Sequence, residues 1–305
     1  MYDPFYLDYY SIIKKYENLE ELDYKKILIS GMGGSGIFGD YTKQILNDKE
    51  IVVCKDYFLP KFIDKDWLTI FISYSGDTEE TLNCMDEAIN NGNKIVAISS
   101  GGEMEKIAKE KNLYYIKIDN NYPATRYTFP VILGIILSIL DKKKYYELLE
   151  MLENYRERLK DLSIFVNDIK NPIMIYTDVK HEPVALALKM HLNEDTKWFS
   201  EYGIISEYNH HDLEGISKLD IDFILLKFNY YERIEYRINY MKDLLEMYGN
   251  NVLLFDLKYR NLMEELVLGT LSLRTFTLKL AEKNNVDPYH SKNIAGLKAF
   301  LKNIK

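Results

Sequence analysis

The sequence predicts an α/β protein built from two doubly wound parallel sheets. Short apolar runs rich in Ile and Val alternate along the chain with longer amphipathic segments. Turns of glycine and serine follow several of the apolar runs, where a strand would end and a helix begin. The chain has 305 residues, which suits two domains of about 150 residues each. We therefore expect one domain over residues 1–150 and a second over 151–305.

The first half contains five short apolar runs, which fit strands buried on both faces. The expected strands are Ile27–Ile29, Ile51–Val53, Leu68–Ser73, Lys94–Ser99 and Leu113–Ile118. The expected helices are Gly36–Leu46, Thr78–Asn91, Glu103–Glu110 and Arg126–Leu140. Strands that alternate with helices in this way indicate a parallel sheet covered on both faces.

We interpret Lys142–Lys144 and the polar–apolar helix expected over Tyr145–Asn167 as a connector between the two halves. Strands are expected at Ile173–Thr177, Phe223–Lys227 and Val252–Asp256. Helices are expected at Pro183–His191, Ile234–Tyr248 and Asn261–Lys283, with a last one over Ser291–Lys302 after the break at Asp287–Pro288. The second half therefore resembles the first in architecture.

Composition excludes several classes of partner. The formal net charge is -8, so the sequence predicts no basic face that would bind nucleic acid or an anionic membrane. The most apolar stretch, Val131–Leu140, is too short to cross a bilayer, and the N-terminus does not resemble a signal peptide. The two cysteines, Cys54 and Cys84, form no disulfide framework, which favours a reducing cytoplasm.

A glycine-rich turn, Ile29–Gly36, follows the first expected strand. Glycines allow a sharp turn whose N–H groups approach an anion, and a helix N-terminus adds a favourable partial charge. The spacing of Gly31, Gly33 and Gly36 also fits a dinucleotide-binding loop, but no acidic residue is clearly placed about 20 residues further on.

A second turn, Ser73–Thr78, carries three hydroxyls that are well placed to bind one phosphate. The alternative is that Ser75 and Thr78 only cap the following helix. A third turn, Ser99–Gly102, follows the next strand. Three small-residue turns at successive strand ends indicate one anion site at the carboxyl edge of the sheet.

These three turns resemble the sugar isomerase (SIS) domain, which has a flavodoxin-like fold. In particular, the chain resembles the bifunctional phosphoglucose/phosphomannose isomerases, which contain two such domains. The resemblance spans nearly the whole chain and implies a phosphate site, whose residues would be Gly34, Ser35, Ser73, Ser75 and Thr78.

The segment Asn193–Lys197 resembles the family segment whose glutamate is the catalytic base, which implies that role for Glu194. Glu207–His210 resembles the family segment whose histidine opens the sugar ring, which implies that role for His210. A carboxylate with a raised pKa and an imidazole suit proton transfer near neutral pH. The alternatives are a solvated carboxylate and a metal pair of His210 with His211, but no further ligand motif completes a metal site.

The resemblance also assigns residues near the reacting carbons. Arg126 would stabilise the enediolate, Lys298 in the last helix would reach the active site, and Ser291 would contribute to substrate specificity. The chain departs from the family pattern at Asp195–Thr196, where Asn-Ala is usual, and at His211–Asp212, where Asn-Glu is usual.

The implied activity is the interconversion of glucose 6-phosphate and mannose 6-phosphate with fructose 6-phosphate through a cis-enediol, without cofactor or metal. The resemblance also implies a homodimer whose active sites are shared, with the histidine supplied by the neighbouring subunit. The alternatives are a non-catalytic sugar-phosphate sensor, an aminosugar-phosphate isomerase and a nicotinamide enzyme. Only the glycine-rich turn supports the last of these.

Overall fold

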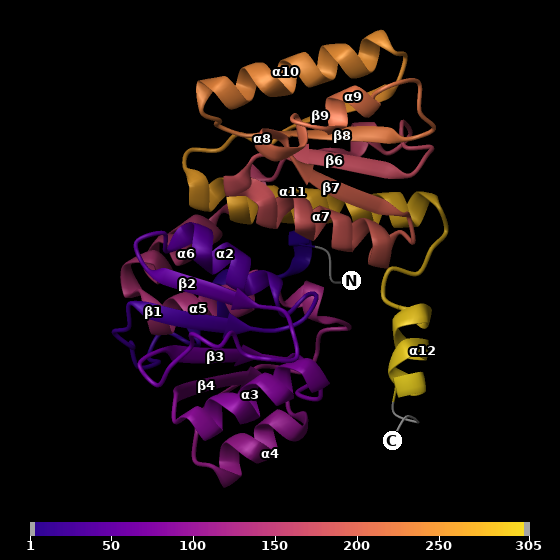
Figure 1. Cartoon of the computed structure of the whole chain (residues 1–305). Helices are drawn as coiled ribbons and strands as arrows, with labels where there is room; N and C mark the ends of the chain where they lie inside the picture. Colours follow the sequence, from indigo (N-terminus) through magenta and orange to yellow (C-terminus); the bar gives the residue numbers. More distant parts are fainter. Residues whose placement is uncertain (1–3, 302–305) are drawn as a thin grey trace. The chain divides into compact units, whose positions relative to one another are not determined.

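The computed structural model describes residues 4–301 (Figure 1). Within them the chain forms two compact units. One comprises Tyr6–Tyr155, and the other comprises the residues from Arg156 onward together with Pro4 and Phe5. No helix in the part of the chain that the structure describes has the length and apolar character needed to cross a membrane.

The first unit contains a parallel five-stranded sheet in the order β2-β1-β3-β4-β5. Its strands are β1 (Lys26–Ser30), β2 (Glu50–Cys54), β3 (Leu68–Ile72), β4 (Lys94–Ser99) and β5 (Tyr114–Lys117). This is the flavodoxin-like order, in which the winding direction reverses between β1 and β3. The loops that follow β1 and β3 therefore flank the crevice where open α/β sheets bind ligands.

Helices cover both faces of this sheet. The helical segments from residue 4 to residue 153 are η1 (Pro4–Tyr6), α1 (Tyr9–Lys14), α2 (Ile37–Ile45), α3 (Glu79–Asn91), α4 (Gly102–Glu110), η2 (Thr125–Thr128), α5 (Val131–Leu140) and α6 (Lys142–Glu153). One face packs Leu28, Phe71 and Ala97 against α3 and α4. On the other face α2 approaches so closely that a Cβ at Gly39 would lie 2.8 Å from the Val53 side chain.

The second unit contains a parallel four-stranded sheet in the order β7-β6-β8-β9. Its strands are β6 (Ile173–Thr177), β7 (Ser200–Ile204), β8 (Asp222–Lys227) and β9 (Asn251–Asp256). Strand direction and order repeat those of the first four strands of the first sheet. The reversal of winding consequently falls between β6 and β8.

Helices also cover both faces of the second sheet. The helical segments from residue 155 to residue 301 are η3 (Tyr155–Arg158), η4 (Ser163–Phe165), η5 (Val179–His181), α7 (Glu182–Asp195), α8 (Ile205–Tyr208), α9 (Asp212–Gly215), α10 (Glu232–Met247), α11 (Leu262–Lys283) and α12 (Lys292–Leu301). One face packs Phe223 and Leu225 against α10. The other packs Phe255 against Phe276 of α11, with ring centroids 5.0 Å apart, and α11 lies beside α7 (Figure 1).

The structure confirms all eight expected strands, with boundaries that differ by at most one residue, and adds β7, which sequence analysis missed. β7 is an edge strand paired only with β6, and its residue Glu201 is exposed. A strand that is buried on one side only shows no continuous apolar run, which explains the omission.

Three expectations about helices were wrong. Lys142–Lys144 is the first turn of α6 rather than a connector, because the Asp141 side chain caps it by accepting from the Lys144 N–H at 2.9 Å. The helix expected over Tyr145–Asn167 ends at Glu153 and is followed by the short 3₁₀ turns η3 and η4.

The helix expected from Arg126 is also interrupted. Arg126 lies in the 3₁₀ turn η2, and α5 begins only at Val131. Phe129 is extended because the residue before a proline is disfavoured in the helical region, and Pro130 then precedes the first turn of α5. Arg126 is therefore held on a turn before the helix.

Candidate active site

The turn between β1 and α2 is a tight backbone loop that requires glycine. A Cβ at Gly36 would lie 2.4 Å from the Gly31 carbonyl oxygen, and one at Gly31 would lie 2.9 Å from the Ile72 carbonyl oxygen. Gly33 has φ +50°, a conformation that residues with a side chain rarely adopt. The loop therefore presents Ser35, which is buried, at the N-terminal end of α2.

The turn between β3 and α3 brings its hydroxyls together. The Ser73 hydroxyl donates to the Thr78 hydroxyl at 2.9 Å and accepts from the Gly76 N–H at 3.1 Å. Thr78 is the N-cap residue of α3, but its side chain makes no capping hydrogen bond. The Thr78 hydroxyl therefore does not serve as a helix cap, which was the alternative to phosphate binding. Ser75, which is exposed, accepts from the Asp77 N–H at 3.3 Å.

The turn between β4 and α4 is joined to the preceding one by close backbone contact. Gly76 has φ +77°, and a Cβ there would lie 1.8 Å from the Gly101 carbonyl oxygen. The Met104 N–H donates to the Gly76 carbonyl at 2.9 Å, and the Asp77 carboxylate accepts from the Glu103 N–H at 2.9 Å. These contacts hold the two turns as one rigid edge.

Arg126 reaches the same edge from the segment after β5. A Cβ at Gly34 would lie 3.2 Å from the Thr125 Cβ and 3.3 Å from the Arg126 nitrogen, so the glycine-rich turn packs directly against η2. Arg126 is buried, and its guanidinium carbon lies 4.9 Å from the centre of the Tyr127 ring. The structure thus brings the expected phosphate residues and Arg126 to the carboxyl edge of the first sheet.

Glu194 lies in the last turn of α7 and is partly buried. The adjacent Asn193 fixes this helix end to the start of β7, because its amide accepts from the Ser200 N–H at 3.1 Å and donates to the Ser200 carbonyl at 3.3 Å. Asp195 is fully buried and pairs with the His191 imidazole at 2.8 Å. Glu194 therefore lies at the amino edge of the second sheet.

His210 lies on the opposite edge. It follows α8, which begins directly after β7, and its side chain is exposed. The neighbouring Asp212 accepts from the Tyr176 hydroxyl at 2.7 Å near the carboxyl end of β6. Because β7 runs between the two positions and its five residues span about 16 Å, the structure does not bring Glu194 and His210 of one chain together.

Ser291 and Lys298 belong to the C-terminal part of the second unit. The Lys197 ammonium donates to the Glu194 carbonyl and, at 2.7 Å, to the His290 carbonyl. This lysine therefore ties the end of α7 to the residue before Ser291. Lys298 lies on α12, which buries none of its side chains, and is exposed.

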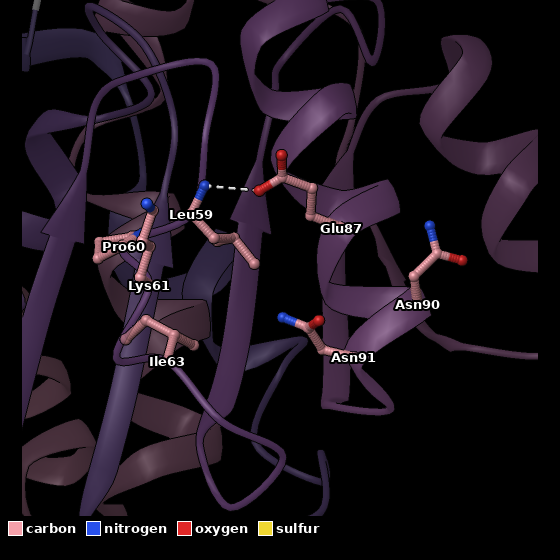
Figure 2. A pocket seen from close by; sticks show the side chains of 7 residues that line it. All are labelled: Leu59, Pro60, Lys61, Ile63, Glu87, Asn90 and Asn91. Atoms are coloured by element: carbon pink, nitrogen blue, oxygen red, sulfur yellow. Dashed lines mark hydrogen bonds between the residues drawn. The ribbon is translucent and has the colours of Figure 1, made fainter.

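An open pocket of about 330 Å³ lies elsewhere on the first unit (Figure 2). It is formed by the segment between β2 and β3 and by the C-terminal half of α3, where Glu87 accepts from the Leu59 N–H at 2.9 Å. It contains none of the expected site residues. Among residues 4–301, no three His, Cys, Asp or Glu side chains are grouped so that they would hold a metal ion.

Sequence analysis did not single out two groups of side chains that the structure shows. Asp178, His181 and Glu265 form a buried cluster at the carboxyl edge of the second sheet. Tyr74 links several loops of the first sheet. Both depend on partners far away in the sequence, and no local motif marks them.

Comparisons with known proteins agree with this architecture. Residues 160–301 match the model of the bacterial phospho-glucose isomerase C-terminal SIS domain. The chain is 34% identical over 240 residues, 74% of either chain, to the bifunctional phosphoglucose/phosphomannose isomerase of Aquifex aeolicus. It is 29% identical over 199 residues, 62% of this chain and 63% of the other, to the D-glucosamine-6-phosphate 4-epimerase of Sulfolobus acidocaldarius.

The fold is shared with solved structures. A hypothetical protein from Thermus thermophilus superimposes with a TM-score of 0.75 and 13% sequence identity, over 98% of this chain and 90% of that chain. At this level of identity the likeness concerns the α/β fold with its parallel sheets.

Proposed function

This chain belongs to the family of bifunctional phosphoglucose/phosphomannose isomerases, and from that premise we propose that it interconverts glucose 6-phosphate and mannose 6-phosphate with fructose 6-phosphate. The observation that carries the proposal concerns the loops at the carboxyl edge of the first sheet, where the winding direction reverses. There hydroxyls and N–H groups lie close together beside the buried Arg126. Such an edge is the place where open α/β sheets bind phosphorylated ligands.

In this proposal the phosphate is bound on the first domain by Gly34, Ser35, Ser73, Ser75 and Thr78. Two features support it: a Cβ at Gly31, Gly36 or Gly76 would clash with backbone, so the turns require glycine there, and the Thr78 hydroxyl is not used to cap α3. The net charge of -8 requires such local donors, because the overall field of the protein repels an anion.

We assign the proton transfer between C1 and C2 to Glu194 and the opening of the sugar ring to His210. A single carboxylate can take the proton from one carbon and return it to the other, which passes through a cis-enediol. Arg126 would stabilise the negative charge that develops on the enediolate oxygens, since a guanidinium is always charged. Lys298 would add a second positive charge when the C-terminal helix returns to the active site.

Ser291 is assigned to substrate specificity. Its support is the link that Lys197 makes between the Glu194 carbonyl and the His290 carbonyl, since this link holds Ser291 close to the end of α7. Glucose and mannose 6-phosphate differ only in the face that presents the C2 proton, so a hydroxyl near C2 is suited to accept both epimers.

We further propose that the protein is a homodimer whose active sites are shared. The location of Glu194 and His210 on opposite edges of the second sheet supports this, because one subunit then supplies the base of one site and the histidine of the other. Two free buried thiols, Cys54 and Cys84, support the cytoplasm as its location.

The proposal is tested by the turnover of fructose 6-phosphate after treatment with a chelator, with both glucose and mannose 6-phosphate measured as products. We expect both products from the wild type. Glu194→Gln should lower kcat at least about 10³-fold while phosphate binding stays within about threefold of the wild type. A wild-type protein that binds sugar phosphates but forms neither product would instead be a sensor.

A second candidate is a reaction on an aminosugar phosphate, which the similarity to the glucosamine-6-phosphate 4-epimerase favours. The same assay with D-glucosamine 6-phosphate as substrate separates the two. Turnover of this compound at a kcat/KM above that for fructose 6-phosphate would favour the second candidate.

A further inference from the structure

Tyr74, in the loop after β3, forms hydrogen bonds to three other loops at the carboxyl edge of the first sheet, those after β1, β4 and β5. Its N–H donates to the Ser35 hydroxyl after β1 at 3.4 Å. Its carbonyl accepts from Ser100 after β4, from the N–H at 3.0 Å and from the hydroxyl at 2.6 Å. Its own hydroxyl reaches Tyr122 after β5.

The contact with Tyr122 uses both functions of the Tyr74 hydroxyl. It donates to the Tyr122 carbonyl at 2.8 Å and accepts from the Tyr122 N–H at 2.9 Å. A phenol is suited to this because it is a donor and an acceptor at once. The Tyr122 side chain is buried, and without the Tyr74 hydroxyl two backbone groups of Tyr122 would lose these two hydrogen bonds.

The hydrogen bonds of Tyr74 connect the loops that carry Ser35 and Arg126. From Tyr122 the chain passes through Pro123, whose φ is fixed by its ring, to Thr125 and Arg126. Thr125 and Arg126 pack on Gly34, which is adjacent to Ser35, and Ser35 accepts from the Tyr74 N–H. Tyr74 therefore links the backbone segment that carries Arg126 to the loop that carries Ser35.

We propose that Tyr74 is a positioning residue that fixes Arg126 relative to the phosphate site without contacting the reacting atoms. The inference rests on the proposed function, because it concerns the same site. It assigns the Tyr74 hydroxyl to the step in which Arg126 stabilises the enediolate, and not to phosphate binding, for which Ser73 and Thr78 remain in place.

The test is Tyr74→Phe, which keeps the ring and removes only the hydroxyl. A displacement of a catalytic group by about 1 Å can cost about 100-fold in rate, so we expect kcat for fructose 6-phosphate to fall by about 10- to 100-fold. KM and the Kd for inorganic phosphate should change less than about threefold. Because the hydroxyl acts through Arg126, adding Tyr74→Phe to Arg126→Lys should lower kcat no further.

Tyr115→Phe is the matched control. The Tyr115 hydroxyl lies at the same sheet edge and contacts Ser99, at 3.1 Å from its hydroxyl and 3.2 Å from its carbonyl. It makes none of the bonds to Tyr122. An equal loss of kcat in Tyr74→Phe and Tyr115→Phe, or a full additional loss on top of Arg126→Lys, would overturn the proposal.

A readout without turnover keeps this inference separate from the proposed function. Arg126 is buried, so its modification by phenylglyoxal, mapped by mass spectrometry, should be slow in the wild type and faster in Tyr74→Phe but not in Tyr115→Phe. If Tyr74→Phe does not fold, Pro123→Gly loosens the same link and should give the same acceleration. Unchanged modification of Arg126 in the folded variant would refute the positioning role, whatever the substrate is.

Discussion

At the scale of single residues, a buried histidine is held between two carboxylates in the second unit. The His181 ring is stacked on Phe228 at 3.9 Å, with Nδ1 2.5 Å from Asp178 and Nε2 3.1 Å from Glu265. Burial lowers the pKa of His181, but hydrogen bonds to Asp178 and Glu265 outweigh it, so the pKa is raised above its ordinary value. The imidazolium therefore contributes to the stability of the fold.

This arrangement predicts how stability depends on pH. The pKa of His181 is raised in the folded state, so its contribution is complete below the unfolded pKa of about 6.5 and is lost as the pH rises through the folded pKa. His181→Gln removes the cation and leaves Asp178 and Glu265 buried, which should cost about 3 kcal/mol at about pH 6 and less at higher pH. Urea unfolding at several pH values measures this.

His211→Gln is the control for that prediction. His211 lies 2.7 Å from Asp212 but is exposed, and such pairs contribute about 0–1 kcal/mol. A loss in His211→Gln as large as that in His181→Gln, or a loss in His181→Gln that does not shrink as the pH rises, would contradict the role of burial.

Two glycines with nearly the same φ allow the steric requirement of the proposed phosphate site to be measured. Gly76 and Gly92 have φ +77° and +76°, but only Gly76 faces a clash, with the Gly101 carbonyl, while nothing lies within 4 Å of a Cβ at Gly92. Gly92→Ala should cost about 1–2 kcal/mol, from backbone strain alone. Gly76→Ala should cost clearly more and weaken binding of inorganic phosphate more than about tenfold. An equal loss of unfolding free energy in the two variants would show that the Gly101 backbone moves away from the added Cβ at little cost.

At the scale of helices, two glycines test how tightly each helix packs on its sheet. Gly39 of α2 would place a Cβ 2.8 Å from Val53, whereas Gly269 of α11 would place one 3.4 Å from Phe228, an ordinary contact. Gly39→Ala should destabilise the protein by about 1–3 kcal/mol through overpacking. Gly269→Ala should be neutral or stabilise it by up to about 1 kcal/mol, because alanine is the better helix former. Thermal unfolding of both variants measures the difference, and destabilisation by Gly269→Ala would contradict it.

The last helix presents an apolar stripe together with its lysines. Ile294, Leu297 and Phe300 are 44%, 57% and 63% exposed. If α12 returns to the active site, Lys298→Ala should lower kcat by about 10- to 100-fold, since a positive charge near the enediolate is lost. Lys292→Ala, on the same helix, should leave kcat within about twofold. Equal effects of the two substitutions in the isomerase assay would refute the assignment of Lys298.

At the scale of the whole molecule, shared active sites predict complementation between inactive variants. When Glu194→Gln and His210→Ala subunits are mixed and allowed to exchange, a mixed dimer contains one site with both substitutions and one site with neither. We expect activity to return to about a quarter of the wild-type level, since about half of the dimers are mixed and each has one intact site.

The control is a mixture of Glu194→Gln with Glu194→Gln, His210→Ala double-variant subunits, in which every possible site lacks the base. No recovery is expected there. If the first mixture also stays inactive although mixed dimers are detected by mass, base and histidine belong to the same subunit.

Features that depend on neighbouring residues could be predicted from the sequence. The strands of the first sheet follow from uniformly apolar runs, because a parallel strand covered on both faces has no polar side. The turns at the carboxyl edge of the first sheet follow from the glycines at strand ends, because those backbone conformations admit few other residues. The family also follows from these motifs.

The tertiary structure alone decided which distant residues meet. It showed that Glu194 and His210 lie at opposite edges of one sheet, although 16 positions in the sequence separate them. It also joined Tyr74 to Tyr122, 48 positions apart, and His181 to Glu265, 84 positions apart. A hydrophobic pattern specifies which segments are buried, but the strand order and the packing of helices fix which side chains come within hydrogen-bonding distance, and these depend on the whole chain.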